Sequence, residues 1–256
     1  MCIRASKNTN FVFSGQKCKF VNMETKEIKQ SKRIQTSVLN AAERKALMWL
    51  ASKQPAWMTS NILTFIGIAG SVIIALGYIL SDKNIAWLWL ASAGFVINWY
   101  GDSLDGSLAR YRNAQRPVYG FYLDHMVDVF NEMLMFIGVG LSALMDLRIG
   151  LFLFAAYLMM TVNVSVNAHL KSEFKLTYAR VGPTEFRIIV IIVNTLLILI
   201  RPLREFSLQV ALGSDTFLLT ALDLVGLVIS AVLFIMFMAS FFGDLRYYAK
   251  IDPPKK

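Results

Sequence analysis

Long apolar stretches separated by short polar segments dominate the chain after its first 58 residues. About 20 apolar residues are enough for a helix to cross the hydrocarbon core of a bilayer. Six stretches reach that length, and they run roughly from Thr59 to Leu80, Ile85 to Arg110, Tyr119 to Leu144, Ile149 to Leu170, Pro183 to Arg201 and Thr216 to Phe242. The pattern predicts an all-α integral membrane bundle of six transmembrane helices.

The segment before the first span has a different pattern, in which apolar residues such as Leu47 and Leu50 are set against Glu43, Arg44 and Lys45. Such a stretch is typical of an amphipathic helix lying along the cytoplasmic membrane surface. The alternative is a helix packed on the bundle as in a soluble protein. We therefore expect four regions: a disordered or dispensable tail (1–36), an interfacial amphipathic helix (37–58), a six-span domain (59–243) and a basic C-terminal tail (244–256). Met23, within the first tail, is an equally plausible start of translation.

Composition supports a membrane protein, because 56% of the residues are hydrophobic and only 17% are charged. The net charge of +9 would suit nucleic acid, but its distribution fits membrane topology better. With six spans, 22 of the 26 Lys and Arg residues fall on the side of both termini and 4 on the other. Positive residues concentrate on the cytoplasmic side. We expect both termini in the cytoplasm, the bacterial inner membrane as location, and no nucleic-acid partner. Cys2 and Cys18 show no metal-ligand spacing.

Four aspartates interrupt the second and third apolar stretches. Asp102 and Asp105 are three positions apart and Asp124 and Asp128 are four apart, so each pair lies on one face of its helix. The polar turn RYRNAQRPVYG between them predicts antiparallel neighbours whose acids converge. Each ionised carboxylate costs roughly 2.5 to 3.5 kcal/mol in a membrane, and like charges repel. Oxygen ligands suit hard divalent cations, and Mg²⁺ commonly bridges carboxylates and phosphates, so the cluster predicts phosphate chemistry.

The residues around these acids extend the motif. The string Asp102-x2-Asp105-Gly106-x2-Ala109-Arg110-x9-Gly120-x3-Asp124-x3-Asp128 resembles the signature of the CDP-alcohol phosphotransferase family, also called CDP-alcohol phosphatidyltransferases. The resemblance implies a membrane enzyme, a homodimer, that binds a CDP-alcohol and two divalent cations, Mg²⁺ or Mn²⁺. The resemblance also implies that an acceptor hydroxyl attacks the phosphate bearing the alcohol and that CMP leaves.

By the same resemblance, the four aspartates hold the metals and Asp128 also acts as the base. Gly106, Ala109, Arg110 and Gly120 shape the nucleotide pocket. The alternatives are a salt-bridge network between helices or, from another class, a membrane cation transporter that uses the same acids. Asp102 lies about eight residues, or ~12 Å, from the cytoplasmic end of its helix, a depth where lipid and cytosolic substrates meet.

Further polar residues extend the candidate site. Asn61 and Thr64 resemble a family element that helps hold the nucleotide, although Ser60 stands where proline is usual and a plain helix N-cap is an equal alternative. Glu132 continues the acidic face beyond Asp128, and we expect it to support the site rather than bind metal. His125 makes a helix–helix hydrogen bond or lies near the acceptor hydroxyl.

Basic residues on the cytoplasmic side suggest the substrates. Lys171, Arg187 and Arg246 are candidates for binding a phosphate on the acceptor. We therefore expect CDP-diacylglycerol as the lipid donor and a small polar alcohol, free or phosphorylated, such as an inositol or glycerol phosphate, as the acceptor. His125 favours the alternative, in which CDP-choline or CDP-ethanolamine donates to diacylglycerol. His125 and Val129 stand where the Asp-Pro-x-x-Asp-Lys variant typical of bacterial phosphatidylglycerophosphate synthases has Pro and Lys, which argues against glycerol phosphate as the acceptor.

Overall fold

The computed structural model of the chain describes residues 32–34, 39–171, 173–175, 182–212 and 215–254, and these are mostly helical. The helices are α1 (Asn40–Ser52), α2 (Ser60–Leu80), the 3₁₀ turn η1 (Ile85–Trp87), α3 (Leu88–Tyr111), α4 (Pro117–Gly140), α5 (Leu147–Lys171), α6 (Pro183–Leu199), α7 (Arg201–Arg204) and α8 (Ala221–Ile251). The all-α prediction is confirmed in outline, because long helices account for most of the described residues.

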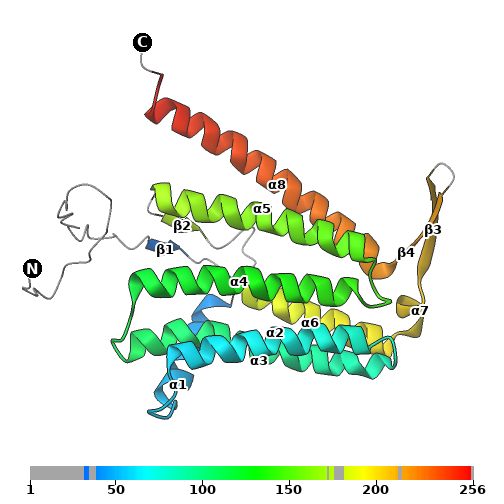
Figure 1. Cartoon of the computed structure of the whole chain (residues 1–256), viewed down its shortest axis with the longest axis horizontal. Coiled ribbons are helices and arrows are strands. Elements are labelled where there is room, and N and C mark those ends of the chain that lie inside the picture. The colour runs from blue at the N-terminus through cyan, green and yellow to red at the C-terminus, as the bar shows by residue number, and fades with distance from the viewer. Residues whose placement is uncertain (1–31, 35–38, 172, 176–181, 213–214, 255–256) are drawn as a thin grey trace, which may run out of the picture. The chain divides into compact units, whose positions relative to one another are not determined.

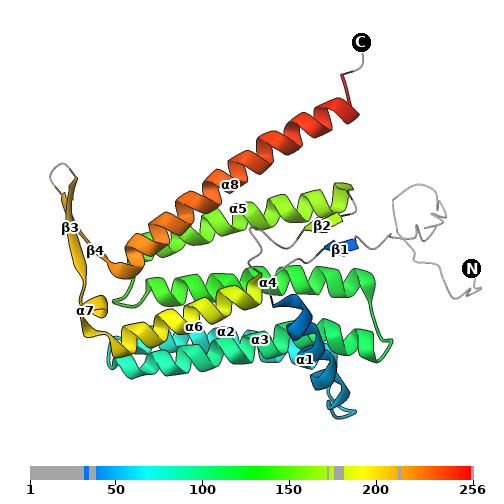
Figure 2. The same ribbon diagram turned by 180° about the vertical axis from the view of Figure 1, so that it is seen from behind.

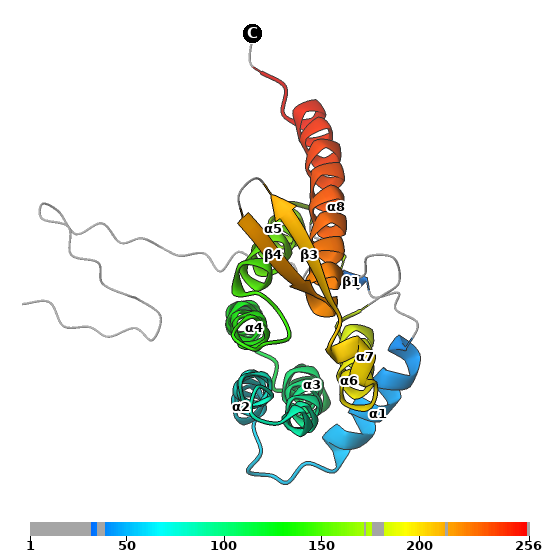
Figure 3. The same cartoon turned by 90° about the vertical axis from the view of Figure 1, so that its right-hand side faces the viewer.

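Three of the described helices are long and apolar enough to cross a membrane: α2, α5 as far as Asn167, and α8. Helices α3 and α4, at 24 residues each, have the length but carry the aspartates, and α6 has 17 residues. Helix α2 packs on α3 and α4, α4 on α5, α5 on α8, and α6 on α3 (Figures 1 and 3). Helix α1 and the β3–β4 hairpin lie at opposite ends of these helices (Figure 1).

Glycine allows α2 and α3 to approach closely. Gly67 on α2 faces Gly101 on α3, and a Cβ added to Gly101 would overlap the backbone nitrogen of Gly67. Small residues at a crossing let helix backbones come together where the membrane provides no hydrophobic driving force. This contact fixes α3, and with it the aspartates, against α2.

Two apolar clusters flank a polar layer in the bundle. Towards α1, Leu47 and Ala51 of that helix pack with Leu63, Leu104 and Leu108. Towards the other end, the second cluster contains Ile74, Tyr78, Leu88, Ala91, Phe95, Leu144 and Leu197. The polar layer between them holds side chains that are buried or half-buried, namely Thr64, Ser71, Asn98, Asp102 and Asp105. Burying polar groups is costly unless they are paired, so this layer marks a candidate site.

Helix α1 forms within the region expected to be amphipathic, and it packs on α3. Its inner face buries Leu47 and Ala51, whereas Trp49 remains 61% exposed. Arg112 at the end of α3 donates hydrogen bonds to the backbone carbonyls of Gln54, Pro55 and Met58, which anchors the α1–α2 connection. Helix α1 is therefore fastened to the bundle by packing and by hydrogen bonds.

Turns shape both ends of α4. After α3, Asn113 adopts a positive φ of 52°, which asparagine tolerates at a helix C-terminus. Before α5, Asp146 accepts hydrogen bonds from the guanidinium and backbone nitrogen of Arg148. The Arg148 guanidinium lowers the pKa of Asp146 to about 2, so this carboxyl is ionised at neutral pH. Asp223 on α8 accepts the backbone N–H of Asp146, which ties α8 to this turn.

Strands were not predicted, and the structure corrects this. Strands β3 (Ser207–Leu212) and β4 (Asp215–Thr220) form an antiparallel hairpin that pairs Leu208 with Leu219 and Val210 with Phe217. The predicted last span began at Thr216, because the apolar residues of β4 run directly into those of α8. Thr220 caps α8, and this helix continues to Ile251, into the region predicted as a C-terminal tail.

A second pair of strands lies partly inside the tail expected to be disordered. β1 (Lys32–Ile34) pairs in parallel with β2 (Glu173–Lys175). The rest of the predicted tail, apart from these three residues, lies outside the described residues.

Candidate active site

Helices α3 and α4 bring three of the four predicted aspartates together. Asp102 on α3 and Asp124 and Asp128 on α4 each offer a carboxylate oxygen, and these oxygens lie within 4.8 Å of one another. All three side chains are half-buried. The three- and four-residue spacing on antiparallel helices, joined by the short turn at residues 112–116, gives the convergence that the sequence predicts.

Asp105, the fourth aspartate, lines the same pocket but has different partners. Its Oδ2 accepts a hydrogen bond of 2.7 Å from the Thr64 hydroxyl, and its Oδ1 accepts the backbone N–H of Gly106. The Ser60 hydroxyl donates to the Asp105 carbonyl. The pocket is lined by residues of α2, α3 and α4, among them Thr64, Gly67, Asp102, Asp105, Asp124 and Asn131.

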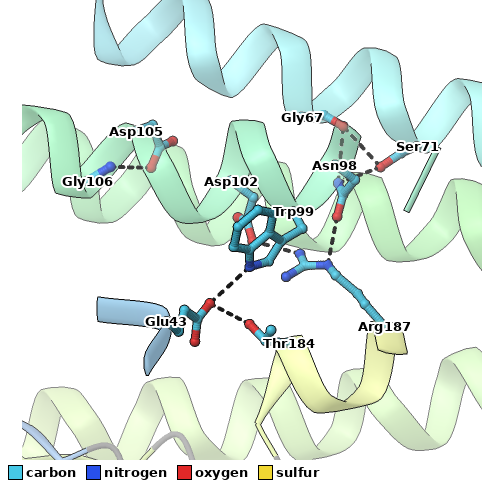
Figure 4. Close-up of polar contacts among 10 residues, drawn as sticks. All are labelled: Glu43, Gly67, Ser71, Asn98, Trp99, Asp102, Asp105, Gly106, Thr184 and Arg187. Carbon is cyan, nitrogen blue, oxygen red and sulfur yellow. Dashed lines mark hydrogen bonds and ion pairs between the residues drawn. The ribbon is translucent and has the colours of Figure 1, made fainter. Parts of the chain in front are cut away.

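Arg187 on α6 supplies positive charge to the aspartates. Its Nη2 donates to Asp102 Oδ2 at 2.7 Å, and its Nε donates to Asn98 Oδ1 at 3.0 Å (Figure 4). Asn98 in turn donates to the Gly67 carbonyl and to the Ser71 hydroxyl. Nη1 of Arg187 is buried and finds no hydrogen-bond partner among the described residues. The guanidinium is thus held rigidly and retains one unused donor.

The residues present fit a hard divalent cation. The three clustered donors are carboxylate oxygens, the ligand type that Mg²⁺ and Mn²⁺ prefer. Asn131 lines the same pocket and is buried. Its Oδ1 has no hydrogen-bond partner in the described part of the chain. An orphaned carbonyl oxygen costs about 1 to 3 kcal/mol, which a cation or a bound water would offset. Asp102, Asp124 and Asp128 are the residues that would hold the cation.

Comparison with known families identifies the family of the chain. A model of the CDP-alcohol phosphatidyltransferase family matches residues 57–232, more than two thirds of the chain. The chain belongs to the CDP-alcohol phosphatidyltransferase family. The resemblance drawn from the aspartate motif is therefore confirmed, and the match covers α2 to α6 and the start of α8.

Relatives of the chain differ in the substrates that their names state. Cholinephosphotransferase 1 of Homo sapiens is 28% identical over 154 residues, which are 58% of this chain and 38% of that protein. The Mus musculus protein of the same name is 26% identical over 151 residues. Phosphatidylinositol phosphate synthase of Cutibacterium acnes is 34% identical over 86 residues, 34% of this chain and 39% of that protein. The chain spans about two fifths of the length of each of these relatives.

The remaining motif residues of the CDP-alcohol phosphatidyltransferase signature lie near the cytoplasmic ends predicted for α3 and α4. Ala109 is half-buried and Arg110 is exposed, with a hydrogen bond to the Ser107 hydroxyl. A Cβ on Gly106 would meet the Arg110 guanidinium at 3.3 Å, whereas a Cβ on Gly120 would meet nothing within 4 Å. These residues border the aspartates in sequence, and none of them lines the pocket described above.

The residues at the start of α2 divide into two groups. Thr64 lines the pocket and holds Asp105, whereas Asn61 is exposed and donates a long hydrogen bond of 3.4 Å to the Tyr119 hydroxyl. Thr59 is the N-cap, since its hydroxyl accepts the backbone N–H of Ile62. The capping alternative thus applies to Thr59, while Thr64 reaches the site.

Two of the three predicted basic residues have described side chains, and these two lie apart. Arg187 is bound to Asp102, whereas Arg246 is exposed on α8, a helix that packs on α5. Lys171 is the last residue of α5, and its side chain lies outside the described residues.

His125 and Glu132 lie on α4 beside the aspartates. The His125 Nδ1–H donates to the Phe121 carbonyl of the same helix at 2.9 Å, and the imidazole lies 3.9 Å from Asp124. This hydrogen bond lies within α4. Glu132 accepts a hydrogen bond from the Tyr157 hydroxyl of α5, and its Oε2 is buried without a hydrogen bond among the described residues.

Sequence reasoning missed Asn98 and Asn131. Asn98 lies four residues before Asp102, and Asn131 lies three residues after Asp128, so both share a helix face with an aspartate. Applying the spacing rule to amides as well as to acids would have found both residues, because polar side chains in membrane helices mark functional positions.

Proposed function

We propose that this chain transfers a phosphoalcohol group from a CDP-alcohol to an acceptor hydroxyl and releases CMP, as a step of phospholipid synthesis. The observation that carries the proposal is the convergence of Asp102, Asp124 and Asp128 within 4.8 Å beside a pocket of α2, α3 and α4. Membership of the CDP-alcohol phosphatidyltransferase family gives this cluster its chemistry.

Each acid has a part in the proposed reaction. Asp102, Asp105, Asp124 and Asp128 would hold two divalent cations, Mg²⁺ or Mn²⁺, whose positive charge would neutralise the pyrophosphate and stabilise the CMP leaving group. Asp128 accepts the proton of the acceptor hydroxyl as that hydroxyl attacks phosphorus.

The residues around the acids would bind the nucleotide. Asn61 and Thr64 on α2, Gly106, Ala109 and Arg110 on α3 and Gly120 on α4 border the acids and supply polar groups and open backbone for the cytidine diphosphate. Thr64 supports this role indirectly as well, because its hydrogen bond fixes the Asp105 carboxylate.

Arg187 suggests the acceptor. Its guanidinium is fixed by Asp102 and Asn98, and Nη1 is buried with no partner among the described residues. A phosphate on the acceptor would use this donor. We therefore favour phosphatidyl transfer from CDP-diacylglycerol to a small phosphorylated alcohol, with Lys171 and Arg246 as further candidate contacts. The phosphatidylinositol phosphate synthase relative agrees with this choice.

A second pair of substrates is favoured by His125. The imidazole lies beside Asp124, and three of the relatives are cholinephosphotransferases. In this alternative, CDP-choline or CDP-ethanolamine donates to diacylglycerol, and His125 lies near the acceptor hydroxyl.

The proposed membrane arrangement has six spans, α2 to α6 and α8. Helix α1 lies along the cytoplasmic interface, with the exposed Trp49 towards lipid. Both termini and the aspartates are then cytoplasmic, the hairpin is on the opposite side, and the location is the bacterial inner membrane. A homodimer is proposed from the family resemblance alone.

Purified protein in lipid nanodiscs would test the reaction. CMP release is measured with CDP-diacylglycerol and inositol, inositol phosphate or glycerol phosphate, and with CDP-choline or CDP-ethanolamine and diacylglycerol. Release with a phosphorylated acceptor supports the favoured substrates, and release with diacylglycerol supports the alternative. Absence of CMP with every pair, together with Mn²⁺ flux into vesicles, would overturn the enzyme in favour of a cation transporter.

A further inference from the structure

Glu43, a charged residue of α1, points into the bundle. Its Oε1 accepts a hydrogen bond of 3.0 Å from the indole N–H of Trp99 on α3 and one of 2.5 Å from the Thr184 hydroxyl on α6 (Figure 4). Its sequence neighbours Arg44 and Lys45 are exposed, as expected for the polar face of an interfacial helix. One carboxylate of α1 thus joins two other helices.

The two hydrogen bonds of Glu43, called the Glu43 bridge below, join α3 and α6. The ion pair between Arg187 and Asp102 joins the same two helices. Trp99 and Asp102 are three residues apart on α3, and Thr184 and Arg187 are three residues apart on α6. Helix α6 therefore reaches α3 twice near the site, once directly through Arg187 and once through Glu43 (Figure 4). Residues three positions apart lie about one turn apart on the same side of a helix. The Glu43 hydrogen bonds and the Arg187–Asp102 ion pair therefore hold neighbouring turns of α3 and α6.

Other contacts hold α1 in the orientation that the bridge needs. The Leu39 backbone N–H donates to Glu185 Oε1 on α6, while Glu185 Oε2 accepts the backbone N–H of Gly182 and so caps α6. Gln54, just beyond α1, donates to the Tyr100 hydroxyl on α3. Figure 2 shows α1 beside α6 and α3 from the side opposite to Figure 1. Helix α1 is thereby fixed to α6 near its N-terminal end and to α3 near its C-terminal end.

We propose that Glu43 is a positioning residue that joins α3 to α6 through Trp99 and Thr184, and so sets the place of Arg187 relative to Asp102. This inference rests on the proposed transferase function for its effect on catalysis, but the bridge itself is a structural claim. The interfacial helix is then part of the active-site framework and not merely a membrane anchor. Misplacing a substrate-orienting group by about 1 Å can cost about 100-fold in rate.

The first test compares Glu43→Ala with Glu43→Gln and with Arg44→Ala as a control. The amide introduced by Glu43→Gln would keep a carbonyl oxygen that accepts both hydrogen bonds, so this variant should retain activity within a few-fold. Glu43→Ala should lower kcat/KM for CMP release by about 10- to 100-fold. Arg44→Ala should leave kcat/KM unchanged, because Arg44 is exposed on the same helix.

A second set of variants acts from α6 and preserves side-chain volume. Thr184→Val removes the hydroxyl donor and should lower kcat/KM in the same direction, whereas Thr184→Ser should restore it. Thr195→Val is the matched control, because the Thr195 hydroxyl donates to the Ile191 carbonyl of its own helix and to no other group in the described part of the chain. These variants keep the test valid if Glu43→Ala fails to fold.

Two readouts do not depend on activity. The indole proton resonance of Trp99 should lose its hydrogen-bond shift in Glu43→Ala and keep it in Glu43→Gln. Spin labels at the exposed positions Val96 on α3 and Ile189 on α6 should show a broader distance distribution in Glu43→Ala only. An unchanged indole resonance in Glu43→Ala would mean that the bridge does not form.

The remaining outcomes separate this inference from the proposed function. Wild-type kcat/KM in Glu43→Ala, or lost activity with an unchanged α3–α6 distance, would overturn the positioning role. If the wild-type protein releases no CMP with any substrate pair, the proposed function fails. The indole resonance and the spin-label distances would then still decide whether Glu43 positions α6 against α3.

Discussion

Asp102, Asp124 and Asp128 repel one another, because their oxygens approach within 4.8 Å inside a helix pair. Arg187 pairs directly with Asp102, and none of the described basic residues forms an ion pair with Asp128. A cluster of this kind weakens the fold when no cation is bound. We therefore expect the cluster to serve ligand binding and not folding.

Asp128→Asn should separate activity from stability. Removal of one like charge should raise the unfolding temperature of the protein in chelator, by a few degrees, because repulsion is relieved. Loss of the proposed base should lower CMP release by about 10²- to 10⁴-fold. Thermal unfolding in detergent and the CMP assay measure the two effects.

Glu205→Gln is the matched control for this change, since Glu205 pairs with the exposed Arg201 beyond α6. It should leave CMP release unchanged. A lower unfolding temperature together with full activity in Asp128→Asn would contradict the role given to Asp128.

Thr64 is not a proposed metal ligand, but it holds one of the acids by a hydrogen bond. Its hydroxyl donates to Asp105 Oδ2 at 2.7 Å, and the residue is buried. Thr64→Val keeps the volume but removes this donor, so metal affinity or activity should fall by about 10- to 100-fold. The metal concentration that gives half-maximal CMP release measures the effect. Thr64→Ser should rescue it, and equal metal dependence in Thr64→Val and wild type would exclude this role.

At the scale of elements, the contact between α2 and α3 controls the depth and rotation of the aspartates. Gly67 and Gly101 let the two backbones approach, and Asn98 bonds across the same contact to the Gly67 carbonyl and the Ser71 hydroxyl. The site is thus supported by a rigid helix pair, and α4 adds Asp124 and Asp128 to it. Changes at the glycines should act on the site without touching any acid.

Gly101→Ala tests this contact. The added methyl group would overlap the backbone of Gly67, so α2 and α3 must separate. Overpacking of this kind costs about 1 to 3 kcal/mol. Thermal unfolding should show the loss, and CMP release should fall with it. Gly243→Ala is the control, because a Cβ there meets nothing within 4 Å. Equal stability of Gly101→Ala and wild type would mean that the helices are not in close contact.

At the scale of the whole molecule, α1 lies towards one end of the helices and the hairpin towards the other (Figure 1). The acids lie in the halves of α3 and α4 that are nearer the turn joining these two helices. The distribution of Lys and Arg predicts that the end with α1 is cytoplasmic. Labelling of single cysteines in intact cells tests this orientation, in a variant whose Cys2 and Cys18 are replaced by serine. Gln115→Cys, in the α3–α4 turn, should resist an impermeant thiol reagent, and Gln209→Cys, in β3, should react. The reverse result would invert the topology.

The sequence predicted the helices and the acid cluster well because both depend on local spacing. The three- and four-residue intervals placed Asp102, Asp124 and Asp128 together without knowledge of the fold, and α2 begins within one residue of its predicted start. The hairpin was missed because hydropathy alone cannot separate the apolar β4 from α8. The pairing of Arg187 with Asp102 and of Glu43 with Thr184 joins residues 85 and 141 positions apart, which no local pattern reveals.

Binding of Mn²⁺, followed by the loss of its free electron paramagnetic resonance signal, tests most directly whether the aspartates of α3 and α4 hold divalent cations. We predict that the wild-type protein in nanodiscs binds Mn²⁺, that Mg²⁺ competes, and that Asp102→Asn and Asp124→Asn each weaken binding at least about 10-fold. A free Mn²⁺ signal that the wild-type protein leaves unchanged, or variants that bind as tightly as the wild type, would contradict the account.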